Sequence, residues 1–148
     1  MIVEDSLRPA TGKPPKFRVE MRNTGKDDLV LHLGIMLANG RKQYPEAITL
    51  IISDFEGESR TFQLCGPVGV RVDPMVVPFP AGATLSLPID VANYWPVSSE
   101  EFDYKLRGGY SIEAKFTGEN VPRATNMLLA PNWVGVVTSN QLTFTVSN

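Results

Sequence analysis

The chain has one cysteine and one histidine, too few for the sites that these residues usually build. A lone Cys65 cannot form an intramolecular disulfide, so cysteine content identifies no redox compartment. A metal centre or a catalytic triad at His32 needs further ligands or an oriented partner, and the sequence has neither a second histidine nor a nucleophile-elbow motif. We therefore predict no enzyme activity, no catalytic residue, no metal site and no cofactor.

A strong net charge and long apolar runs are also absent. The 14 basic and 16 acidic residues give a formal net charge of −2, which supplies no positive field for nucleic acid or anionic lipid. No stretch approaches the roughly 20 apolar residues of a membrane-spanning helix. The acidic loop with Asp54, Glu56 and Glu58 lacks the ligand count of a calcium loop. We expect no nucleic-acid partner, no membrane span and no bound calcium.

Proline and glycine are plentiful, with 12 of each, and indicate the many turns of an all-β protein. A length of 148 residues is typical of one domain. We divide the chain into an extended N-terminal lead-in, residues 1–15, and a single domain, residues 16–148. Alternating apolar and polar residues predict about seven strands. These strands lie near residues 17–22, 29–33, 48–53, 60–65, 84–91, 110–117 and 141–147.

The apolar phase of these strands predicts one shared core. Its members are Phe17, Val19, Leu31, Leu50, Leu87, Ile112 and Phe144. The polar run Asp54–Ser59 predicts a hairpin loop, whereas the turn at Asn23–Asp28 fits either a hairpin or a crossing between sheets. Four prolines between Pro67 and Gly82 predict at most short edge segments there. A long loop is expected before the last strand, and the capping-box spacing of Ser98 and Glu101 predicts a helical turn.

Gly108-Gly109-Tyr110 joins a glycine turn to the start of a strand. In Greek-key sandwiches a tyrosine at this place returns its hydroxyl to backbone upstream and is called a tyrosine corner. The sequence thus predicts an immunoglobulin-like Greek-key sandwich with a tyrosine corner at Tyr110.

A family resemblance rests on several runs. They are Phe17–Leu33 with its Asn23-Thr24-Gly25 turn, Ile48–Gly57, and Pro80-Ala81-Gly82 before a strand. With them the chain resembles exported bacterial immunoglobulin-like domains of unknown function. It is also distantly similar to the β-sandwich family of intracellular proteinase inhibitors from bacilli, from which no functional residue is carried over. The first resemblance implies a secreted or periplasmic protein in preference to a cytoplasmic one, with Met1 either a native start or a residue that follows a removed signal peptide.

Both tryptophans lie in expected connections, which carry binding in sandwich folds. The candidate binding residues are Tyr94, Trp95, Asn132 and Trp133. The main hypothesis is a non-enzymatic binding or protein-interaction module with an unknown protein or glycan partner. Three alternatives stay open: a proteinase inhibitor that uses the loop Val121–Trp133, a carbohydrate-binding module with Asn93, Asn126 or Asn132 beside a tryptophan, and tryptophans that only plug the ends of the sandwich. A homodimer through a sheet edge is also compatible with the sequence.

Overall fold

The computed structural model describes residues 2–4, 16–38, 40–64, 66–67, 69–97, 108–120 and 130–146. These residues form an all-β, sandwich-like fold with one short 3-10 helix, η1 (Val91–Asn93), and no α-helix. The strands are β1 (Ile2–Glu4), β2 (Lys16–Arg22), β3 (Leu29–Leu37), β4 (Gln43–Tyr44), β5 (Ile48–Asp54), β6 (Ser59–Leu64), β7 (Val72–Phe79), β8 (Thr84–Asp90), β9 (Tyr94–Pro96), β10 (Gly108–Gly118), β11 (Gly135–Thr138) and β12 (Leu142–Val146).

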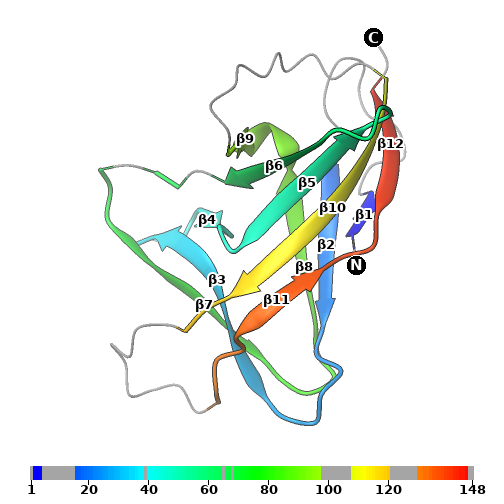
Figure 1. The fold of residues 1–148 in the computed structure, drawn as a ribbon. Helices are drawn as coiled ribbons and strands as arrows, with labels where there is room; N and C mark the ends of the chain where they lie inside the picture. Colours follow the sequence, from blue (N-terminus) through cyan, green and yellow to red (C-terminus); the bar gives the residue numbers. More distant parts are fainter. Residues whose placement is uncertain are drawn as a thin grey trace.

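The strands assemble into three antiparallel sheets (Figure 1). The largest has the order β11-β10-β5-β6-β9, and β12 pairs with another part of β10. A second sheet has the order β1-β2-β8, and a third the order β4-β3-β7. In Figure 1, β2 and β8 lie behind the sheet that contains β10, and β3 and β7 continue below it. All seven strands predicted from alternation are present, and the alternating residues explain how one face of each sheet is buried.

The predicted core is confirmed, because its seven members belong to one buried cluster. Each of them is at most 7% exposed, and the cluster joins residues from all three sheets. Phe17 and Phe144 meet edge to face across the sandwich with ring centroids 5.3 Å apart. Removing a large side chain from such a core typically costs about 2–5 kcal/mol.

The turn at Asn23–Asp28 is a crossing between sheets and not a hairpin. β2 pairs with β8 in one sheet, whereas β3 pairs with β7 in another. Asn23 holds the crossing: its backbone N–H donates to the Ala83 carbonyl, and its own carbonyl accepts from Gly82, both at 2.9 Å. β2–β3 and β7–β8 therefore form one antiparallel ribbon that bends at Asn23.

The loop between β5 and β6 is the predicted hairpin. The Asp54 carboxylate accepts backbone N–H groups of Glu56 at 2.9 Å and Glu58 at 3.0 Å. The acidic side chain at this position thus shapes the turn, as aspartate commonly does.

The expectation of only short segments between Pro67 and Gly82 is wrong, because β7 runs for eight residues. Both of its prolines lie where the missing N–H faces away from β3. Pro78 pairs with Val30, whose own N–H and carbonyl bond to residues 131 and 133 and not to β7. Pro74 pairs with Ile35, which faces β4 on its other side. β7 is an edge strand, where proline is tolerated.

The long loop expected before the last strand contains a further strand, β11, which pairs with Lys115–Gly118 of β10. The three-residue strand β9 was also not predicted, and it pairs with β6. Both pairings join segments that are far apart in sequence, so local alternation gives little signal for such short strands.

Tyr110 is half-buried in β10, and its ring stacks on Phe144 with centroids 5.7 Å apart. The residues that lead into this strand, 98–107, lie outside the described residues, as do the predicted helical turn, Cys65 and residues 5–15 of the lead-in. The tyrosine corner stays a prediction.

Candidate functional site

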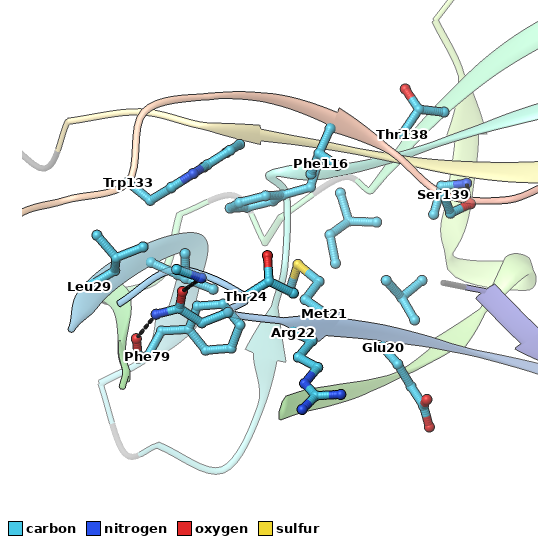
Figure 2. Close-up of a pocket in the computed structure, with 17 residues that line it drawn as sticks. Glu20, Met21, Arg22, Thr24, Leu29, Phe79, Phe116, Trp133, Thr138 and Ser139 are labelled. Carbon is cyan, nitrogen blue, oxygen red and sulfur yellow. Dashed lines mark hydrogen bonds between the residues drawn. The ribbon is translucent and has the colours of Figure 1, made fainter. Parts of the chain in front are cut away.

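A cleft of about 430 Å³ opens between β2 and β11 and reaches down to the core (Figure 2). It is the larger of the two hollows described below. Its floor includes the buried residues Leu31, Ile48 and Ala114. The volume lies within the range of about 300–1,000 Å³ that is typical of ligand pockets.

Strand β2 forms one wall of the cleft. Its odd-numbered residues face inward: Val19 is buried and Met21 half-buried, whereas Arg22 is exposed. Figure 2 shows Met21 directed towards Phe116, while the side chains of Glu20 and Arg22 point away from it. The ionisable groups of this wall therefore lie at the rim, and a thioether and a valine line the interior.

Phe116, Trp133 and Val137 form the opposite wall. The rings of Phe116 and Trp133 stack with centroids 5.3 Å apart and an interplanar angle of 21°. Val137 pairs with Phe116 across β10 and β11, so both side chains lie on the inward face. Val137 is nevertheless 48% exposed, because it stands at the mouth of the cleft.

Trp133 is fixed by backbone contacts and by two glycines. Its N–H donates to the Val30 carbonyl, and the Val30 N–H donates to the Pro131 carbonyl, both at 2.9 Å. Gly118 and Gly135 pair directly beneath the indole. A Cβ at Gly118 would overlap the Trp133 ring and would lie 2.6 Å from its carbonyl oxygen. Only a residue without a side chain lets the indole approach β10 this closely.

Asn23 closes the end of the cleft next to the bend between β2 and β3. Its side chain is buried; its Nδ2 group donates to the Phe79 and Asp27 carbonyls at 2.9 Å, and its Oδ1 accepts the Gly25 N–H at 3.0 Å. The side chain of Asn23 thus forms its hydrogen bonds within the protein and holds this end of the cleft in place.

The four predicted binding residues do not form one site. Trp133 lines the cleft, and Asn132 beside it forms a parallel bridge with Val30 while its buried Oδ1 accepts no hydrogen bond from the described residues. Tyr94 is 2% exposed and belongs to the core, where desolvation raises the pKa of its hydroxyl. Trp95 is 57% exposed on β9, at the opposite end of the sheet from β11.

The remaining candidate residues lie outside the lining of the cleft or outside the described residues. His32 lines a smaller hollow of about 210 Å³ that also contacts Glu46 and Glu119. No group of three or more potential metal ligands is present in the described part of the chain. Most of the proposed inhibitory loop, residues 121–129, and Asn126 with it, lie outside the described residues, whereas Asn93 is exposed in η1.

Sequence reasoning missed Met21 and Val137 as parts of a binding surface. The alternation of apolar and polar residues in β2 predicts that Met21 lies on the buried face, but it does not predict that this end of the face is open to solvent. The run Val134-Gly135-Val136-Val137 is apolar and falls within the long loop expected before the last strand. Its three valines are β-branched residues that favour strands, and this is the sequence signal for β11.

No protein family, curated protein or solved structure matches the chain. The resemblance to exported immunoglobulin-like domains and to the proteinase inhibitors therefore stays a prediction. No helix among the described residues is long and apolar enough to cross a membrane.

Proposed function

We propose that this protein is a non-enzymatic binding module and that the cleft between β2 and β11 receives an apolar part of its partner. The observation that carries the proposal is the lining: Met21, Phe116, Trp133 and Val137 present apolar surface around a hollow that opens to solvent. Apolar surface in a concave site gains free energy when a partner displaces its water, at about 25 cal/mol per Å² buried.

A binding role fits the chemistry of this lining better than catalysis does. General acid–base catalysis needs titratable groups that converge on a reacting atom. The ionisable side chains of the cleft, Glu20 and Arg22, belong to the outward phase of β2. Thr24 and Thr138 supply hydroxyl groups at the edge, which suit orientation of a ligand more than proton transfer. The Ser139 hydroxyl is engaged within the protein, because it accepts the Ala114 N–H and donates to the Asn140 carbonyl.

The proposal extends to the fold: the domain is an immunoglobulin-like Greek-key sandwich that enters β10 through a tyrosine corner at Tyr110. The crossing at Asn23 supports this topology, because Greek-key sandwiches move strands from one sheet to the other. Gly108, with a φ of 107°, supports a tight entry into β10.

A matched pair of variants tests the cleft. Val136 and Val137 are neighbours on β11 and are 59% and 48% exposed, but only Val137 lines the cleft. The fluorescence of the apolar dye 1-anilinonaphthalene-8-sulfonate should rise with wild-type protein and with Val136→Glu, and should be lost with Val137→Glu. Chemical denaturation should show the three proteins equally folded. No rise with the wild type, or an equal rise with both variants, contradicts the proposal.

A second candidate function rests on Trp95. Its side chain is 57% exposed and pairs in register with Gln63, which is also exposed, so an indole and an amide share one outward face. Indole and amide groups together bind pyranose rings by stacking and hydrogen bonding. Quenching of Trp95 fluorescence by oligosaccharides in a Trp133→Phe background would support a glycan ligand; an unchanged spectrum with a broad oligosaccharide panel removes this candidate.

A further inference from the structure

We infer that the occupant of the cleft is an extended segment of a partner protein, which adds to β2 as a strand and places alternate apolar side chains into the cleft. This inference rests on the proposed binding role of the cleft and states the shape and chemistry of the ligand. Strand addition of this kind derives affinity from main-chain hydrogen bonds and specificity from pockets for alternate side chains.

The first argument is the edge of β2. Backbone groups of successive residues in an antiparallel strand point alternately to the two sides. Asn23 bonds Ala83 and Gly82 on the β8 side, so the N–H and carbonyl of Arg22 point to the other side. Within the described residues no strand pairs with Met21 or Arg22 on that side. A strand edge therefore borders the cleft.

The second argument is continuity with an existing pairing. β1 occupies the same edge of β2 at Phe17–Val19, with Ile2 opposite Val19. A partner segment opposite Met21 and Arg22 would lie in line with β1 and continue the same sheet. Figure 1 shows β1 beside β12.

The third argument is the depth of the cleft. Side chains of an added strand alternate between its two faces, so every second residue would enter the cleft. About 430 Å³ between Met21 on one wall and Phe116 on the other accommodates such side chains. Aromatic and sulfur-containing walls favour large apolar partners such as Leu, Met or Phe. The remaining residues of the segment would face solvent and can be polar.

The backbone of β2 provides the most direct test. Arg22→Pro removes the N–H that would bond the added strand, and proline is tolerated at a strand edge. Arg22→Ala removes the same side chain and keeps the N–H. We would select binders from a displayed library of random peptides of about six residues, a typical strand length. Selected peptides should carry large apolar residues at every second position. They should bind Arg22→Pro up to about tenfold more weakly than Arg22→Ala, which is the effect of one net hydrogen bond.

A second measurement does not depend on how Arg22→Pro folds. The selected peptide is synthesised in two forms, N-methylated at its odd or at its even amides. Only one form should lose binding to the wild-type protein, because only alternate amides face β2. Equal tolerance of both forms, or selected peptides without a period of two, overturns the inference.

The outcomes also separate the inference from the function on which it rests. Dye binding that Val137→Glu abolishes, without selection of any peptide, leaves the cleft as a binding site and overturns the strand. Absence of both dye binding and peptide selection overturns both proposals. Concentration-dependent dimers in analytical ultracentrifugation that Arg22→Pro dissociates would identify the occupant as a second copy of this chain and overturn a foreign partner.

Discussion

Asn23 is the polar side chain on which the bend of the β2–β3 and β7–β8 ribbon depends. Replacement by alanine removes three side-chain hydrogen bonds: two donated to the Phe79 and Asp27 carbonyls and one accepted from Gly25. Each contributes about 0.5–1.5 kcal/mol, and a buried carbonyl left without a donor adds to the loss. We expect Asn23→Ala to lower the free energy of unfolding by about 2–4 kcal/mol.

Urea denaturation monitored by tryptophan fluorescence measures this change. Asn23→Asp keeps the acceptor for Gly25 but places carboxylate oxygens against two carbonyls, so it should destabilise at least as much as alanine. Thr24→Ala is the matched control, because Thr24 is exposed beside Asn23 and its replacement should stay within about 0.5 kcal/mol. A loss below about 1 kcal/mol for Asn23→Ala, close to that of one ordinary hydrogen bond, would refute the assignment of the bend to this side chain.

Three further predictions concern Trp133 and two tyrosines. Gly118→Ala should cost about 1–3 kcal/mol by overpacking and shift the Trp133 emission, whereas Gly109→Ala on the same strand, with nothing near its Cβ, should do neither. Tyr110→Phe keeps the stack on Phe144 and should cost about 1 kcal/mol if the hydroxyl forms a tyrosine corner; unchanged stability contradicts the corner. Burial raises the pKa of Tyr94, so this tyrosine ionises at lower pH in the unfolded chain, and the free energy of unfolding should fall as the pH rises above about 10. This fall should be smaller in Tyr94→Phe. Equal pH dependence of the free energy of unfolding in the two proteins, measured by chemical denaturation, contradicts the prediction.

The strands and the core could be predicted because their information is local. In β2 and β10 one side chain in two is apolar, and the burial of Phe17, Val19 and Ile112 follows from that phase. A one-residue shift would bring polar residues such as Arg18 inside, so the pattern alone fixes which face is buried. The hairpin at Asp54 was equally local, since its turn residues lie between two β-rich runs.

Strand β7 shows where local information ends. The number of prolines alone predicts a broken segment, but the effect of each proline depends on whether its missing N–H would face a partner strand. That is decided by Val30 and Ile35 on β3, far upstream in the sequence, whose own backbone groups point away from β7. The number of prolines predicts the edge position of the segment; its length depends on their register.

The site was harder to predict for the same reason. Trp95 and Trp133 both stand beside proline and asparagine in sequence, and nothing local distinguishes them. The structure places Trp133 against Phe116 because Gly118 and Gly135 leave room and Val30 binds its backbone, and it places Trp95 outward on β9. The cleft lies between β2 and β11, which belong to different sheets, so its existence depends on how the two sheets are placed against each other. The residue types in one segment predict which side chains can stack or form hydrogen bonds. An opening between two sheet edges depends instead on the register and the length of the two edge strands.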